Sequence, residues 1–64
     1  SSLQFRRSLY VSQDMKSGDI FTKNNLRIVR PGYGLEPKYY DVLLGKRVKM
    51  DVKKGTKVSW DLLL

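Results

Sequence analysis

Residues 14–26 read DMKSGDIFTKNNL, and 37 residues later residues 51–63 read DVKKGTKVSWDLL. Four aligned positions are identical: an aspartate, a lysine, a glycine and the final leucine. Four more keep the same physical role, pairing methionine with valine, phenylalanine with valine, threonine with serine, and asparagine with aspartate. Because repetition at a fixed spacing is typical of a duplicated supersecondary unit, we predict two copies of one short unit related by approximate two-fold symmetry.

Each copy has a glycine where the chain is expected to turn. Gly18 ends the tripeptide Lys-Ser-Gly, and Gly55 ends Lys-Lys-Gly. Glycine adopts a positive φ at no steric cost, whereas a side chain makes that conformation costly. Three residues after each glycine, Phe21 and Val58 are predicted to be the buried anchors of the two copies.

A hydroxyl residue follows each anchor. Thr22 and Ser59 can accept a hydrogen bond from a backbone N–H one turn later, as a helix N-cap does. We therefore predict single helical turns over residues 22–25 and 59–62. Trp60 lies in the second of these turns and is predicted to fill the core, because aromatic side chains bury a large apolar area.

Three stretches predict short strands, namely residues 8–11, 26–30 and 46–52. In the last of them Val48, Met50 and Val52 alternate with charged residues, and a period of two indicates a strand with one solvated face. Strands this short do not build a barrel or a sandwich. The predicted class is therefore mostly β, with a compact and irregular arrangement.

The second of these strands ends at a loop with two glycines. Leu26 and Ile28 are predicted to share its buried face, with Arg30 continuing that face at the end. Pro31-Gly32 should stop the strand in a type II turn, because proline donates no ladder hydrogen bond and glycine suits the positive-φ position.

Residues 37–44 predict a helix between the two repeats. Pro37 suits the first helical position, and Gly45 lies just past the end. Tyr39, Val42 and Leu43 have the i, i+3, i+4 spacing of a buried stripe.

Composition limits what the chain can be. At 64 residues it is one domain of modest expected stability, with residues 1–4 a linker or cloning remnant and residues 5–64 the domain. Without cysteine or histidine, disulfides and the commonest metal sites are excluded. A net charge of +7 favours an anionic partner. The sequence has no apolar run of the ~20 residues that span a bilayer, so a soluble, cytoplasmic chain without a membrane partner is expected.

Catalytic motifs are missing from the sequence. Without histidine or cysteine, the serines have no evident base to activate them. The six acidic residues fit turn and helix-end roles, and no phosphate loop is present. We therefore expect no catalytic residue and no metal ligand in this chain.

Arg30 and Tyr33 are candidate binding residues. A rigid Pro-Gly turn follows Arg30 directly, so its planar guanidinium can reach outward to a carbonyl or carboxylate from a fixed backbone. A structural arginine that bonds loop carbonyls is the alternative. Tyr33 can likewise stack on a ligand or pack on the surface.

Several motifs resemble one known family. Residues 5–11 (FRRSLYV), the doubled Asp-hydrophobe-Lys-x-Gly unit, Asn25-Leu26, residues 30–34 (RPGYG), 44–46 (LGK) and 53–56 (KKGT) resemble the C-terminal antifreeze-like domain, or SAF domain, of sialic acid synthases. The likeness covers residues 5–64. Residues 30–35 and 37–39 are most similar to bacterial pseudaminic acid synthases, with N-acetylneuraminate and legionaminate synthases as neighbours.

This resemblance implies a β-clip fold, which type III fish antifreeze proteins share. It also implies a parent enzyme whose N-terminal (β/α)8 barrel condenses phosphoenolpyruvate with an N-acetylated hexose. A divalent metal (Mn²⁺ or Mg²⁺) would belong to the barrel, and no cofactor to this domain. In the family the small domain reaches across a domain-swapped homodimer and closes the partner subunit's active site.

The same resemblance implies two substrate-binding residues. The arginine of the Arg-Pro-Gly motif contacts the sugar's N-acyl group in the family, which assigns that role to Arg30. An aromatic residue at the position of Phe5 lines the same pocket.

Two rival functions remain open, and each predicts a different measurement. An ice binder predicts thermal hysteresis, and a nucleic-acid-binding module predicts binding that falls steeply with salt. Nucleic acid is not the expected partner, because the RRM, KH, zinc-finger and helix-turn-helix motifs are missing.

Overall fold

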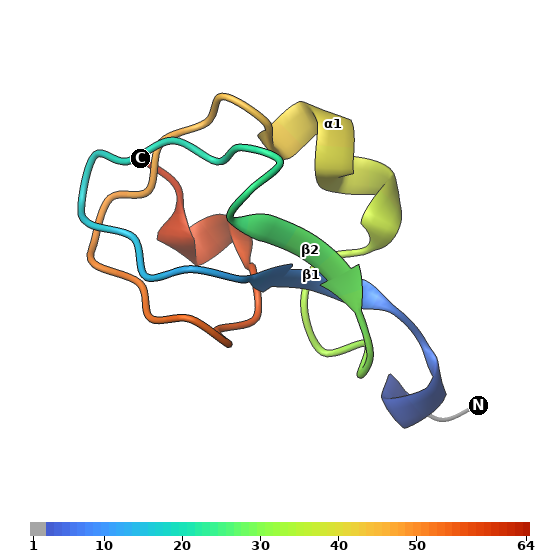
Figure 1. Cartoon of the computed structure of the whole chain (residues 1–64). Coiled ribbons are helices and arrows are strands. Elements are labelled where there is room, and N and C mark those ends of the chain that lie inside the picture. The colour runs from blue at the N-terminus through green and yellow to red at the C-terminus, as the bar shows by residue number, and fades with distance from the viewer. Residues whose placement is uncertain (1–2) are drawn as a thin grey trace.

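The computed structural model describes residues 3–64, so residues 1–2 of the predicted linker lie outside the described part. Two strands, β1 (Ser8–Val11) and β2 (Leu26–Val29), pair antiparallel with Ser8 opposite Val29 and Val11 opposite Leu26. The first strand is as predicted. The second ends one residue before Arg30, because the loop that contains Pro31 turns away from the ladder (Figure 1).

Short helical turns complete the fold around these strands (Figure 1). They are η1 (Leu3–Phe5), η2 (Pro37–Tyr39), α1 (Tyr40–Leu43) and η3 (Trp60–Leu62). No helix within residues 3–64 has the length and apolar character needed to cross a bilayer. The core gathers apolar side chains from both copies of the repeat and from the segments before and between them: Leu9, Val11, Met15, Phe21, Leu26, Leu43, Val48, Val52, Val58 and Leu62.

Backbone pairing follows the 37-residue repeat. Met15 and Val52, which occupy equivalent positions, exchange two hydrogen bonds of 2.7 Å each. The bridge between Ile20 and Arg47 has its counterpart in the bridge between Tyr10 and Lys57, because a shift of 37 residues converts one pair into the other. The two copies are therefore related by a pseudo-two-fold axis near Met15 and Val52, as the repeat predicts.

The repeated aspartates join the copies to each other. The Asp51 carboxylate accepts a hydrogen bond of 2.8 Å from the backbone N–H of Ser17. The Asp14 carboxylate accepts the equivalent 2.8 Å bond from the N–H of Lys54. Each aspartate thus caps the glycine turn of the other copy, so the repeat is a reciprocal unit rather than two independent turns.

Replacing either aspartate with alanine should lower the free energy of unfolding by a similar amount, about 1 kcal/mol, because each change removes one turn-capping bond. Urea denaturation of D14A and D51A measures the two losses. D14N and D51N are the controls, since an amide oxygen keeps an acceptor and should retain most of the stability. A large loss for one alanine variant and none for the other would contradict the reciprocal arrangement.

The glycine turns and buried anchors are confirmed. Gly18 and Gly55 have φ values of 93° and 91°. Phe21 and Val58 are both fully buried. The type II turn predicted at Pro31-Gly32 is wrong, since Gly32 does not have the positive φ that this turn requires. The loop is shaped instead by hydrogen bonds to a serine side chain, described below.

The predicted capped helical turns are only partly present. Residues 22–25 form a hydrogen-bonded turn rather than a helix, and the Thr22 hydroxyl accepts a 3.2 Å bond from the N–H of Asn24. The second copy does form a turn of 3-10 helix, but Ser59 makes no side-chain cap bond. Thr22 therefore acts in a local turn, as its short side chain allows.

Residues 46–52 do not form the predicted strand. Arg47, Val48 and Val52 make isolated bridges with partners on three separate segments, namely Ile20, Leu63 and Met15. The backbone bends between these partners, so no ladder develops. Val48 and Val52 are buried as expected, whereas Met50 is exposed.

Two other side chains predicted to be buried, Trp60 and Ile28, are exposed. Trp60 is 48% exposed and packs edge-on against Tyr39, with ring centroids 5.1 Å apart. Its equivalent in the first copy, Lys23, is also on the surface, so this position faces solvent in both copies. Ile28 is exposed because the core reaches only Leu26 in β2.

The helix between the repeats forms, with a different face buried. Its first turn is the 3-10 turn η2, and α1 follows. Within α1, Leu43 is fully buried while Val42 is 52% exposed. Tyr39 is half-buried, and Gly45 has the positive φ of a residue past a helix end.

Candidate functional site

The two predicted substrate-binding residues lie at one end of the strand pair. Because Ser8 pairs with Val29, the segment before β1 and the segment after β2 emerge at the same end (Figure 1). Phe5 ends η1 and is 69% exposed. Arg30 follows β2 and is also exposed. The antiparallel register therefore brings both side chains to one end of the domain.

The Arg30 side chain makes no hydrogen bond and no ion pair within residues 3–64. Arg47 behaves differently, because its guanidinium donates a 2.8 Å hydrogen bond to the carbonyl of Gly18. The described residues therefore give Arg30 none of the loop-carbonyl bonds that a structural arginine would make. Its donors remain available to a group outside the described chain.

The loop that follows Arg30 is held by a buried serine. The Ser8 hydroxyl donates a 2.8 Å hydrogen bond to the Pro31 carbonyl and accepts a 3.0 Å bond from the Gly34 N–H. Further along, the Leu35 N–H donates to the carbonyl of Val58, and the Leu35 carbonyl accepts from the N–H of Leu9. The backbone beside Arg30 is thus fixed at both ends of the loop.

Gly34 allows this loop to lie against the core. A Cβ at this position would fall deep inside van der Waals contact with the Leu9 carbonyl oxygen, and 3.2 Å from the Val58 nitrogen. Only a residue without a side chain fits such a close approach. Ser8 and Gly34 shape this loop, a role that was not predicted from the sequence. A serine at the start of an apolar strand was the available signal, because a buried hydroxyl must find partners.

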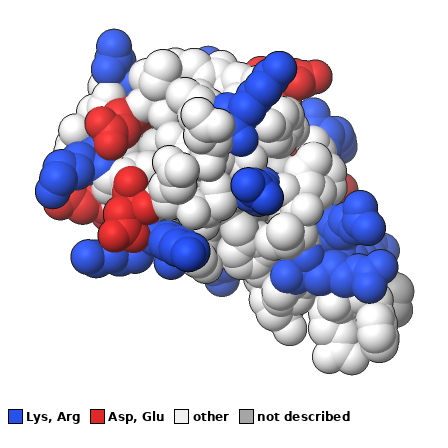
Figure 2. All heavy atoms as spheres, viewed as in Figure 1, with Lys and Arg blue, Asp and Glu red and all other residues white. Residues whose placement is uncertain are grey.

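A depression of about 500 Å³ adjoins this loop. It is lined by the side chains or backbone of Arg6, Arg7, Gly32, Gly34, Glu36 and Pro37. Figure 2 shows basic side chains gathered over the segment that joins η1 to the body of the domain. This end of the molecule therefore combines an exposed aromatic ring, guanidinium groups and a shaped glycine loop, which suits a polar ligand with an acceptor oxygen.

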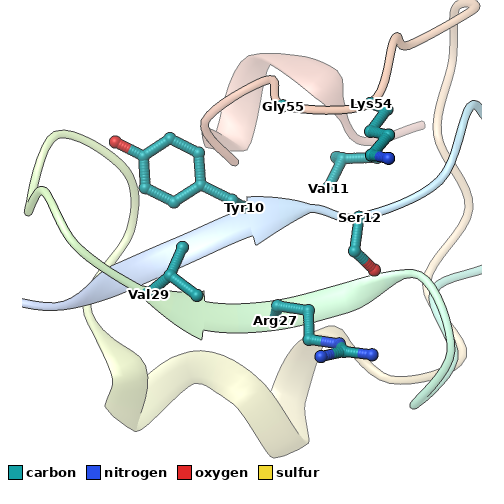
Figure 3. A pocket seen from close by; sticks show the side chains of 7 residues that line it. All are labelled: Tyr10, Val11, Ser12, Arg27, Val29, Lys54 and Gly55. Carbon is teal, nitrogen blue, oxygen red and sulfur yellow. The ribbon is translucent and has the colours of Figure 1, made fainter.

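A second hollow, of about 410 Å³, lies over the outer face of β1 and β2 (Figure 3). Its lining residues are Tyr10, Val11, Ser12, Arg27, Val29, Lys54 and Gly55. Neither Phe5 nor Arg30 is among the residues that line either hollow. Among the described residues, no three acidic side chains gather closely enough to hold a metal ion.

The SAF domain family model matches residues 6–64. Pseudaminic acid synthase of Campylobacter jejuni, serotype O:2, is 51% identical over 51 residues, which are 80% of this chain and 15% of that protein. Pseudaminic acid synthase of Helicobacter pylori is 40% identical over 57 residues, covering 89% of this chain and 17% of that protein. The chain thus spans about a sixth of the length of these curated relatives.

Solved structures agree with the sequence comparison. A spore coat polysaccharide biosynthesis protein of Bacillus subtilis has a TM-score of 0.84 at 29% identity, over 95% of this chain and 18% of that one. An antifreeze-like domain from human N-acetylneuraminic acid phosphate synthase also has a TM-score of 0.84, at 23% identity, over 100% of this chain and 80% of that one. The β-clip fold is therefore confirmed, and the chain belongs to the SAF domain family.

Proposed function

We propose that this chain is the substrate-closing domain of a nonulosonate synthase, which condenses phosphoenolpyruvate with an N-acetylated hexose. The observation that carries the proposal is the Arg30 side chain, which has no partner within residues 3–64 and stands beside a loop fixed by Ser8 and Leu35. The similarity to proteins named pseudaminic acid synthase supports the enzyme class in this proposal.

Arg30 is suited to bind the sugar's N-acyl group. Its planar guanidinium can donate to the amide oxygen, and a hydrogen bond from a charged donor is stronger than one between neutral groups. Because the neighbouring backbone is already fixed, little conformational freedom is lost on binding. Phe5 is exposed at the same end of the domain, and its ring would line the pocket beside the acyl methyl group.

The rest of the site would come from a separate domain. In this proposal an N-terminal (β/α)8 barrel holds the phosphoenolpyruvate, the divalent metal (Mn²⁺ or Mg²⁺) and the acid and base groups. The small domain reaches across a domain-swapped homodimer and covers the partner subunit's barrel. A reading frame that encodes roughly 250 residues of barrel before this domain is the expected gene arrangement.

Arg30→Ala in the full-length synthase should lower kcat/KM for the sugar by about one to two powers of ten, because a hydrogen bond to a charged group contributes ~1.5–3 kcal/mol. Steady-state kinetics with the N-acetylated sugar varied at saturating phosphoenolpyruvate measures the change.

Arg27→Ala is the matched control for this variant. Arg27 is an exposed arginine on β2, the strand that precedes Arg30, so its removal changes the charge equally without touching the loop. It should leave kcat/KM close to the parent value. An Arg30→Ala enzyme with the parent kcat/KM would refute the proposed contact.

A further inference from the structure

Ser8 is a buried polar side chain, and both of its hydroxyl hydrogen bonds go to the loop that follows Arg30. It is 1% exposed, and its hydroxyl is both donor to Pro31 and acceptor from Gly34. These two partners lie on either side of the Gly32-Tyr33 tip. A single oxygen atom therefore joins the two arms of the loop to the first residue of β1.

The position of Ser8 connects this bond to Arg30. Ser8 pairs with Val29, the last residue of β2, and its hydroxyl bonds the carbonyl of Pro31. Arg30 lies between these two contacts along the chain. Its backbone is thus held on one side by the strand pair and on the other by the Ser8 hydroxyl.

We propose that Ser8 is a positioning residue that fixes the orientation in which Arg30 meets the substrate. This inference rests on the proposed function, because it assigns Ser8 an effect on sugar binding that passes through the Arg30 guanidinium. Ser8 itself is buried and would not touch the sugar.

Removal of the hydroxyl should loosen the loop without unfolding the domain. Ser8→Ala leaves the Pro31 carbonyl and the Gly34 N–H without their bonds, whereas the two backbone bonds of Leu35, both 2.9 Å, remain. The Arg30 backbone then samples several orientations, and only a fraction of them match the substrate. A lowered population of the competent state weakens apparent binding in proportion.

The expected result in the full-length synthase is a KM for the sugar raised about tenfold, with kcat within about twofold of the parent value, as for a loss of uniform binding. Ser12→Ala is the matched control. The Ser12 hydroxyl also bonds a backbone carbonyl, that of Asn24 at 2.9 Å, but beyond the opposite end of β1. Ser12→Ala should leave KM unchanged.

A double-variant comparison tests whether Ser8 acts through Arg30. Once Arg30 is alanine, its orientation no longer matters, so Ser8→Ala/Arg30→Ala should match Arg30→Ala alone in KM. Multiplied effects would overturn the inference while leaving the role of Arg30 intact, because variants that act independently combine additively in free energy. An Arg30→Ala enzyme with unchanged kcat/KM for the sugar would instead remove the proposed function and the inference together.

Amide hydrogen exchange separates loop release from unfolding. In the 64-residue chain, Ser8→Ala should speed exchange of the Gly34 N–H by at least about tenfold, while the Leu35 N–H keeps its protection. Ser8→Cys serves as a second variant with a similar volume and a weaker hydrogen-bonding group. It should shift KM and Gly34 exchange in the same direction by smaller amounts. Unchanged Gly34 exchange in both variants would overturn the inference.

Discussion

Replacing Gly34 with alanine is expected to lower the free energy of unfolding by about 3 kcal/mol, at the upper end of the usual cost of overpacking. The added methyl group would meet the Leu9 carbonyl oxygen and the Val58 nitrogen, which are backbone atoms. Both belong to segments held by core hydrogen bonds, so neither can move aside easily. A domain of this size has a total stability of about 3–10 kcal/mol, and the variant should be largely unfolded if the parent lies near the lower value.

Urea denaturation followed by circular dichroism measures this loss. Gly55→Ala is the matched control, because it adds the same methyl group at a position where no atom lies within 4 Å. Its cost comes from the positive φ alone, roughly 1–2 kcal/mol. A Gly34→Ala variant no less stable than Gly55→Ala would contradict the close approach of the loop to β1.

Phe21→Ala should have the larger effect of the two, about 3–5 kcal/mol, because it opens a cavity at the centre of the domain. Phe21 is 1% exposed and anchors the first copy of the repeat. No disulfide supplements the packing of this core, since the chain has no cysteine. The loss equals the whole stability if that of the parent is about 3 kcal/mol, and proton–nitrogen correlation spectra should then show the dispersion of an unfolded chain.

Two companion variants test whether the position of a side chain in the repeat decides how much its loss lowers the free energy of unfolding. Val58→Ala removes the equivalent anchor of the second copy and should cost roughly 2 kcal/mol, because less volume is lost. Trp60→Ala removes a larger ring, yet it should cost only about 1 kcal/mol, since its main specific contact is the edge-on pair with Tyr39. A Trp60 variant less stable than Phe21→Ala would contradict the surface position of this indole.

The site was only partly predictable from the sequence. The motif around Arg30 was visible, and a proline and two glycines marked a loop. What shapes that loop could not be read locally, because Ser8 lies 23 residues before Pro31 in the chain. The type II turn was predicted from Pro31 and Gly32 alone, and it failed because hydrogen bonds from a distant side chain outweigh local turn preference.

The repeat predicted the burial of both anchors correctly, whereas spacing within one segment was right for Leu26 and Val48 and wrong for other side chains. Phe21 and Val58 occupy the same place in both copies, and both are buried. Val42, Ile28 and Met50 were assigned to the core by spacing within one segment, and all three are exposed. Spacing indicates which side chains share a face, but it does not show whether another segment covers that face.

The sequence by itself determined the duplicated unit, its glycine turns and its anchors, because these depend on residue types repeated at one spacing and on the steric freedom of glycine. Only the tertiary structure decided how the copies join. The aspartates cap each other's turns, and Ser8 holds the loop beside Arg30, through bonds between residues 23 to 40 positions apart. Hydrogen bonds of this kind depend on which segments meet when the core packs, and no local pattern specifies that meeting.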